Sequence, residues 1–393
     1  MSKWEWKEFE DCIERVKYTT KIPSKDYLQE GEFPIVSQED CLISGYWNDK
    51  NDLFKVTKPI VIFGDHTKVL KYIDFDFVLG ADGVKILCPK DYLNAHFFFY
   101  FLKSVNFDNL GYARHYRLLK ELSVPIPPLS EQKRIVKFLD EEFSKIDTLK
   151  TNAETNLKNA KELFETTLEK ELNPQSRHSE RSEKSSAELP SGWELKALGD
   201  VCYRIKRGKA PKYVEQSDVL VFAQKCNQPD GTMSLEKALC LDPSILGKYK
   251  AEDYVKEGDV LVNSTGNGTV GRVGFFNNKL LNNKKPVVPD THITTIRGLA
   301  NTFPKYLYYF LKPKESYLSD KSLGTTNMKE LHADVLEHLQ IPLPPLSVQK
   351  EIVARLDKLS ENVKRLEANY KQIIANCDEL KKSILKKTFE GES

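Results

Sequence analysis

Positive charge in this chain gathers in one short stretch, residues 203–213. The stretch carries five Lys and Arg side chains, no acid, and a Tyr at each end. The formal charge of the whole chain is only +2, so a surface that binds a polyanion has to come from local clustering of this kind. Such cations pair with phosphates, and Arg also reads base edges, so the stretch favours nucleic acid as its ligand.

Enzyme signatures are absent from the sequence. There is no GxxxxGK[ST] stretch, and the polar loop 264–274 has the Gly content of a phosphate-binding loop without the Lys and Ser or Thr that complete it. Asn173-Pro174 is followed by Gln175, not by the second Pro of the tetrapeptide that amino-methyltransferases use. The seven Cys residues form no CxxC pair, and His332 and His338 lack an HExxH context. The sequence therefore predicts no catalytic residue, no metal site and no cofactor of its own.

Length and composition indicate a globular protein of more than one domain. The chain has 393 residues, of which 30% are charged and 40% hydrophobic. No apolar run is long enough to cross a membrane, and the first residues, MSKWEWKEFEDC, are too charged for a signal peptide. We expect a cytoplasmic protein whose cysteines are buried thiols in a reducing compartment.

One sequence stretch occurs twice. Residues 125–140 read PIPPLSEQKRIVKFLD and residues 342–357 read PLPPLSVQKEIVARLD, with eleven of sixteen positions identical. The openings WEWKEFEDC (4–12) and WELKALGDV (193–201) also match. The chain is therefore a tandem duplication, in which each copy has an opening Trp segment, a mixed domain, a Pro-rich junction and a long helix.

Each junction predicts the start of a helix. Pro disfavours a helix interior, whereas Ser130 and Ser347 are favourable N-caps. After Ser347, apolar residues recur at alternating steps of four and three from Ile352 to Ile384, which is a heptad seam. A helix from Ser347 to Lys387 would be roughly 60 Å long. The two long helices are similar in length, so we expect them to pair along this seam.

Short strands and turns fill the rest of each copy. In the first copy, the pattern predicts a strand at 59–63, a hairpin formed by 76–80 and 84–87, and a buried aromatic helix at 92–103. In the second, it predicts a turn and strand at 257–263, the polar loop 264–274, and an aromatic helix at 303–312. Residues 173–190 are Ser-rich and charged, which is typical of a flexible linker.

These features together resemble the specificity (S) subunit of type I restriction-modification systems. The resemblance rests on two variable domains that are each followed by a P-x-P-P-L-S-x-Q-K-x-I-V helix. Gly258-Asp259-Val260-Leu261 and Phe63-Gly64-Asp65-His66-Thr67 add to it. The linker is longer and richer in Ser than the family pattern.

The resemblance implies an α+β fold with two mixed α/β target-recognition domains and two long helices that form an antiparallel coiled coil with pseudo-twofold symmetry. The expected boundaries are 1–128 for the first recognition domain, 129–172 for the first helix, 173–190 for the linker, 191–345 for the second domain, and 346–393 for the second helix. It also implies that each domain reads one half of a bipartite, asymmetric site in double-stranded DNA. Two methyltransferase (modification) subunits and the restriction/translocase subunits would bind the chain, and S-adenosylmethionine, ATP and Mg would be held by those partners.

The residues expected to bind DNA lie in loops and just before the junctions. For any one of them, the alternative is a solvated side chain without a DNA role. In the first domain they are His66, Thr67, Lys68, Tyr112, Arg114, His115, Tyr116 and Arg117. In the second they are Lys206, Arg207, Lys209, Lys212, Asn263, Ser264, Asn267, Thr269, Arg272, Thr325, Thr326, Asn327 and Lys329.

Two other functions fit parts of the sequence. The chain could serve a related system in which nuclease and methyltransferase are fused, and its sequence alone does not separate the two. A coiled-coil adaptor without a DNA role would account for the heptads, but it leaves the clustered cations and the duplicated domains unexplained. The base sequence that the two domains would read depends on the geometry of their loops, so it does not follow from the amino-acid sequence alone.

Overall fold

The computed structural model describes residues 4–81, 83–107, 114–173, 189–228, 231–279, 282–325 and 328–390. The chain divides into two compact units, of which unit 1 comprises residues 1–156 with 369–393 and unit 2 comprises residues 157–368. Most of the expected linker, residues 174–188, lies outside the described residues. Among the described residues, no helix is both long and apolar enough to cross a membrane.

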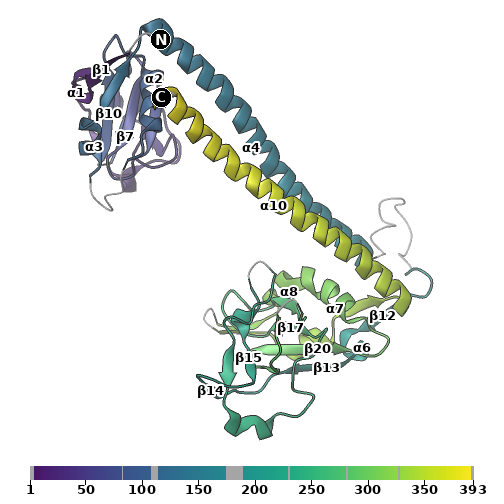
Figure 1. Ribbon diagram of the computed structural model, residues 1–393. Coiled ribbons are helices and arrows are strands. Elements are labelled where there is room, and N and C mark those ends of the chain that lie inside the picture. The colour runs from purple at the N-terminus through teal and green to yellow at the C-terminus, as the bar shows by residue number, and fades with distance from the viewer. Residues whose placement is uncertain are drawn as a thin grey trace. The chain divides into compact units, whose positions relative to one another are not determined.

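Unit 1 contains two main sheets (Figure 1). In one, the strand order is β2-β10-β7-β8 and all pairs are antiparallel, with the fully buried β7 in an inner position. The other has the order β3-β9-β4-β5, with β6 also paired to β9, and its β4 and β9 run parallel. The bounds are β1 (Glu5–Glu8), β2 (Ile13–Glu14), β3 (Lys21–Ile22), β4 (Phe33–Val36), β5 (Gly45–Trp47), β6 (Leu53–Phe54), β7 (Ile60–Gly64), β8 (Leu70–Ile73), β9 (Phe77–Gly80), β10 (Val84–Pro89), β11 (Ser123–Ile126), α1 (Phe9–Cys12), α2 (Ala95–Ser104) and α3 (Tyr116–Lys120).

The prediction of a hairpin at 76–87 is wrong. Its two strands form as β9 and β10, but they belong to different sheets: β9 pairs with β3, β4 and β6, and β10 pairs with β2 and β7. All four residues of β9 are buried, as expected for a strand that is covered on both faces and not for one arm of an exposed hairpin. The Gly between the strands lets the chain change sheets, since Gly83 has φ +101°.

Unit 2 repeats this plan. Its antiparallel sheet has the order β13-β20-β17-β18, and its second sheet, β14-β16-β15-β19, contains the parallel pair β15 and β19. The bounds are β12 (Glu194–Ala197), β13 (Cys202–Arg207), β14 (Tyr213–Val214), β15 (Leu220–Phe222), β16 (Leu239–Leu241), β17 (Val260–Asn263), β18 (Val273–Phe275), β19 (Val287–Pro289), β20 (Ile293–Gly298), β21 (Leu323–Thr325), β22 (Met328–Glu330), β23 (Gln340–Leu343), α6 (Leu198–Val201), α7 (Pro304–Leu311), α8 (Glu315–Asp320) and α9 (Ala333–Glu337).

The glutamine of the repeated junction motif has the same structural role in both units. Gln132 in unit 1 and Gln349 in unit 2 are both 0% exposed. The Gln132 side chain accepts a hydrogen bond from the N–H of Asn94 (2.7 Å) and donates to the carbonyls of Tyr92 and Pro127 (2.9 and 2.8 Å). Because this amide satisfies three backbone groups, it fixes the aromatic helix α2 to the start of the long helix.

Gln349 makes the same three bonds in unit 2. Its side chain accepts from the N–H of Phe303 (2.7 Å) and donates to the carbonyls of Asn301 and Pro344 (3.0 and 2.8 Å). A second repeated bond lies about two helical turns after each Gln. The hydroxyl of Tyr100 donates to Asp140 (2.6 Å), and the hydroxyl of Tyr309 donates to Asp357 (2.5 Å). The repeated Gln and Asp of the motif therefore have structural partners within each unit.

The long helices begin at the expected boundaries, but the expected serines do not cap them. α4 runs Leu129–Leu172 and α10 runs Leu346–Glu390. The N–H of Gln132 bonds the carbonyl of Pro128, and that of Gln349 bonds the carbonyl of Pro345. Ser130 and Ser347 thus lie inside the first turn, so the predicted Ser N-caps are wrong; the Pro before each helix takes that position, because its missing N–H costs nothing there.

The two long helices pair in antiparallel fashion within each unit (Figure 1). In unit 1, Asp147 of α4 binds Lys381 of α10 and Lys150 binds Asp378, so residue numbers rise along one helix as they fall along the other. In unit 2, Glu171 binds Arg355, and Leu168 and Leu172 pack in the same core as Ile352 and Leu356. These contacts confirm the α+β fold with an antiparallel helix pair.

The heptad seam of α10 is buried only in part. Leu356, Val363 and Cys377 of one row are buried, as expected. The other row begins with the buried Ile352, but Leu366, Ile373 and Leu380 further along it are 39%, 41% and 48% exposed. The expectation that the whole seam packs within the chain is therefore wrong, and an apolar stripe remains on the surface of α10.

Candidate nucleic-acid interface

The buried carboxylate of Asp65 brings together the two segments of unit 1 that the sequence predicts to bind DNA. Asp65 follows β7, and its carbonyl accepts a hydrogen bond from the N–H of His115 (2.7 Å). Its side chain accepts another from the N–H of Tyr116 (2.8 Å), and Lys85 lies 3.7 Å from the same carboxylate. Residues 65–68 and 114–117 therefore form one surface region, although about fifty residues separate them in the sequence.

Within that region, the side chains differ in exposure. Thr67, Arg114 and Arg117 are exposed, and His66, Lys68 and Tyr116 are half-buried. His115 is 1% exposed, and its Nδ1 lies 3.0 Å from the carbonyl of Asp65. The expected contact of His115 with DNA is therefore corrected, because its ring holds the loop from the inside. Tyr112 lies outside the described residues.

Unit 2 has the same backbone arrangement at Ser264, which follows β17. The N–H of Ser264 bonds the carbonyl of His292 (2.7 Å), and the carbonyl of Ser264 accepts from the N–H of Leu331 (2.7 Å). Asp65 makes the matching bonds in unit 1, to the carbonyl of Gly83 and from the N–H of His115. The duplicated domains thus keep the same frame around this loop, and the side chains on the frame differ.

Two of the residues expected to bind DNA in unit 2 are wholly buried. Asn263 and Ser264 are 0% exposed. The amide of Asn263 donates to the carbonyl of Gln224 (3.2 Å) and accepts from Asn227 (2.8 Å), and the hydroxyl of Ser264 bonds that of Thr294. These two predictions are corrected, because the polar atoms of both side chains form hydrogen bonds inside the domain.

The loop that follows them does reach the surface. Three of its glycines, Gly266, Gly268 and Gly271, have positive φ. Residues with a side chain rarely adopt this backbone conformation. Asn267 is exposed, and Thr269 is half-buried. Arg272 is half-buried and donates to the carbonyl of Asn227 (2.7 Å), so it braces the loop as well as carrying charge.

The cation cluster of residues 203–213 is mostly paired with acids from elsewhere in unit 2. Lys209 binds Asp253 (2.6 Å), and Lys212 binds Asp242 (2.9 Å). The hydrogen bond from Lys212 lowers the pKa of Asp242 to about 2. Lys206 is exposed, and no ion pair within the described part of the chain involves it. The positive charge that the sequence predicts for residues 203–213 is therefore partly neutralised by acids from elsewhere in unit 2.

Arg207 joins this cluster to a further candidate segment. It donates to Glu330 (2.6 Å) and to the carbonyl of Leu331 (2.7 Å). Glu330 ends β22, where Lys329 is half-buried and pairs across the hairpin with Gly324 of β21. Of the other residues expected here, Thr325 ends β21, whereas Thr326 and Asn327 lie outside the described residues.

Sequence reasoning missed three polar residues at the loop of unit 2. Thr265 lies between the other two: its hydroxyl is 2.7 Å from Nε2 of Gln224 and 2.5 Å from Nδ1 of His292. Thr265 and His292 follow or precede buried strands, which is a usable signal. Gln224 has none, because it lies some forty residues away in the sequence.

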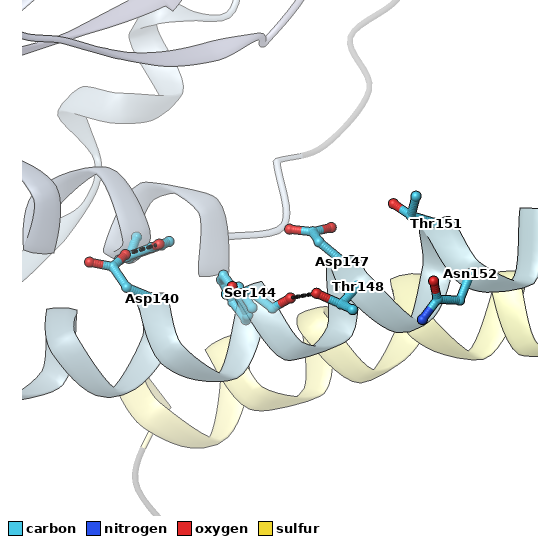
Figure 2. A pocket seen from close by; sticks show the side chains of 8 residues that line it. Asp140, Ser144, Asp147, Thr148, Thr151 and Asn152 are labelled. Atoms are coloured by element: carbon cyan, nitrogen blue, oxygen red, sulfur yellow. Dashed lines mark hydrogen bonds between the residues drawn. The ribbon is translucent and has the colours of Figure 1, made fainter. Parts of the chain in front are cut away.

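Other sites in the described residues fit nucleic acid poorly. No group of three or more His, Cys, Asp or Glu side chains there is placed to hold a metal ion. A pocket of about 560 Å³ lies along α4 in unit 1, and Figure 2 shows Asp140, Ser144, Asp147, Thr148, Thr151 and Asn152 along one face of that helix. Tyr100 and Phe143 complete its lining. It contains acids and no cation, so it would repel phosphate.

Comparison with known proteins identifies relatives over nearly the whole chain. The family model for the type I restriction modification DNA specificity domain matches residues 1–159 and 190–375. The EcoBI specificity subunit of Escherichia coli is 23% identical over 88% of this chain and 75% of its own length. The MjaVIII specificity subunit of Methanocaldococcus jannaschii is 23% identical over 99% of this chain and 92% of its own.

A solved structure shares the fold. It comes from work on complex assembly and conformational transition of the type I R-M system, and it matches with a TM-score of 0.71 and 20% identity. The match covers 100% of this chain and 99% of that one.

Proposed function

Because the chain belongs to the family of type I restriction modification DNA specificity proteins, we propose that it selects the DNA sequence on which a type I restriction-modification complex acts. Each mixed domain reads one half of a bipartite, asymmetric site in double-stranded DNA. The observation that carries this proposal is the loop frame built twice, at Asp65 and at Ser264, with different side chains on the same backbone bonds. Similar frames with different side chains suit two readers of different base sequences.

The chemistry of the complex belongs to partner chains in this proposal. The chain acts as the non-catalytic subunit, two methyltransferase subunits bind S-adenosylmethionine, and restriction subunits bind ATP and Mg. The relatives named above are specificity subunits of type I restriction enzymes, which favours this assignment over a fused system and over an adaptor without a DNA role. Access to chromosomal DNA requires a cytoplasmic location.

The test is a map of adenine methylation by single-molecule sequencing. Cells that carry this chain with the methyltransferase encoded beside it are compared with cells that lack only this chain. We expect one split, asymmetric motif to lose its methylation when the chain is deleted and to regain it when the chain is restored on a plasmid.

Persistence of every methylated motif after deletion would count against the proposal. A silent methyltransferase gene gives the same result, so the purified chain is also mixed with that methyltransferase and a DNA library with random positions. Failure to enrich any split motif in that experiment overturns the assignment.

A further inference from the structure

Each unit places a glutamine at the same point beside its candidate loop. Gln38 lies two residues after β4, and Gln224 lies two residues after β15. These strands are equivalent, because β4 pairs in parallel with β9 as β15 pairs in parallel with β19. Both glutamines are half-buried. The repeated junction motif does not include them.

In unit 1, Gln38 binds the loop that follows β7. Its side-chain Oε1 accepts a hydrogen bond from the N–H of His66 (3.2 Å), and its carbonyl accepts from the hydroxyl of Thr67 (2.6 Å). A Cβ added at Gly83 would lie 2.3 Å from Oε1 of Gln38, so the glycine makes room for this side chain.

In unit 2, Gln224 binds the loop that follows β17. Its Nε2 donates to the carbonyl of Thr265 (2.8 Å) and lies 2.7 Å from the hydroxyl of the same residue. A Cβ added at Gly266 would lie 2.8 Å from Nε2. Equivalent glutamines thus hold equivalent loops, but they do so with opposite ends of the amide.

The loop groups fix which end of each amide is bonded and which end is left for another partner. A backbone N–H can bond only the amide oxygen, so Gln38 turns its NH₂ group away from His66. A backbone carbonyl can bond only the amide nitrogen, so Gln224 turns its oxygen away from Thr265. Neither Nε2 of Gln38 nor Oε1 of Gln224 has a hydrogen-bond partner among the described residues, and neither is completely buried.

We propose that Gln38 and Gln224 are specificity-determining residues, one for each half of the DNA site. This inference rests on the proposed function. Gln38 presents a donor, which suits a base edge with an acceptor, such as the O6 and N7 of guanine or the O4 of thymine. Gln224 presents an acceptor, which suits the amino group of adenine or cytosine. The loop bonds hold each amide in place before DNA arrives.

The first test is Gln38→Glu, which replaces the NH₂ group by an oxygen and adds a negative charge. The carboxylate still accepts from the N–H of His66, but it offers an oxygen where the NH₂ group was. We expect one position in the half-site read by unit 1 to lose its preference by about fivefold to 150-fold and to shift toward cytosine. The other half-site stays the same. The readout is the motif selected from a random library by the complex of full chain and methyltransferase.

The second test is Gln224→Met, which removes both ends of the amide without adding charge. We expect a comparable loss of preference at one position in the other half-site, with the half-site of unit 1 unchanged. Gln340→Glu is the matched control for Gln38→Glu, and Gln340→Met is the matched control for Gln224→Met. Gln340 is exposed and bonds only the carbonyl of His338 (3.3 Å) among the described residues, so we expect both of its variants to select the original motif.

Three outcomes would overturn the inference: an unchanged motif, an even loss of binding at all sequences, or a change in both half-sites from one substitution. If Gln38→Glu fails to accumulate as folded protein, Gln38→Met replaces it and has to relax the same position. If the unaltered chain selects no split motif at all, the proposed function itself fails. If it selects one that neither variant alters, only the role of the glutamines fails.

Discussion

Lys206 differs from the neighbouring cations because it is exposed and has no ion pair within the described chain. We expect Lys206→Ala to weaken DNA binding to all sequences alike and to reduce the slope of log binding constant against log salt concentration by about 1. The measurement is a salt titration of binding by the assembled complex. An unchanged slope would remove Lys206 from the interface.

Lys212→Ala is the matched comparison. Lys212 is exposed as well, but it already neutralises Asp242 at 2.9 Å. Removal of this lysine also leaves Asp242 without its cation, so the variant tests the effect of added negative charge as well as the loss of a phosphate contact. We expect the affinity to change but the salt slope to change by less than about 1. A lysine that already pairs with Asp242 displaces fewer counterions from DNA.

Acid stability should depend on Asp253, which binds Arg204 (3.1 Å) and Lys209 (2.6 Å). Burial raises the pKa of Asp253. Hydrogen bonds from Lys209, the N–H of Lys250 and Arg204 lower it by more than burial raises it, so the pKa is about 2. The value in the folded chain is thus below the ordinary 3.8. The stabilisation is therefore complete above about pH 4 and is lost as the pH falls toward 2, by about 2 kcal/mol.

The variant Asp253→Asn tests this at neutral pH and in acid. At pH 7 we expect a loss of about 3 kcal/mol, because Arg204 stays buried without its counterion. Between pH 4 and pH 2, the variant should lose less stability than the parent chain. The measurement is unfolding of the full chain by urea at each pH, and equal acid sensitivity of the two chains would contradict the assignment.

At the residue scale, the sequence predicts where charge and polar groups occur but not what they bind. The loop residues Thr67, Asn267 and Arg272 reach the surface or its edge, as expected for loop positions. His115, Asn263 and Ser264 do not, because their burial depends on strands and segments far away in the sequence. The acids that pair with Lys209 and Lys212 come from outside the run, so the run alone could not reveal them. Whether the exposed residues contact DNA stays a prediction.

At the element scale, the joint between domain and helix depends on one amide in each unit. Gln349→Met would leave the N–H of Phe303 and two backbone carbonyls without partners in the core. We expect a loss of about 3 kcal/mol of unfolding free energy, since each unsatisfied buried group costs about 1–3 kcal/mol. Urea unfolding measures this, with the exposed Gln340→Met as the control that should stay near the parent value.

Periodicity predicts the elements better than their pairing. The aromatic helices expected at 92–103 and 303–312 form as α2 and α7, within a few residues of the expected ends. The strands expected at 76–80 and 84–87 also form, yet they enter different sheets. Apolar spacing reports which residues are buried, whereas strand pairing is settled by distant contacts that a local pattern does not contain.

At the scale of the whole molecule, we expect the exposed part of the α10 seam, Leu366, Ile373 and Leu380, to contact another subunit. Apolar residues at heptad spacing suit a partner helix. We expect the double variant Ile373→Ser and Leu380→Ser to change the free energy of unfolding by less than about 0.5 kcal/mol. It should nevertheless recover less methyltransferase in a pull-down from cells that express both chains.

The buried row of the same helix provides the control. Leu356 is 0% exposed, and Leu356→Ala should lower the stability of the chain by about 3 kcal/mol. If the Ser variant recovers as much methyltransferase as the parent chain, the exposed part of the seam is not the docking surface, and the partner binds elsewhere.

The joints made by Gln132 and Gln349 have a bearing on evolution. All six of their partners are backbone groups, so the attachment of a domain to its helix places little demand on the side chains around it. We therefore expect that a different domain inserted between the repeated junctions would attach to the helix through the same hydrogen bonds. New DNA preferences can then arise by exchange of whole domains, in one copy of the repeat at a time, without renewed selection on the rest of the chain.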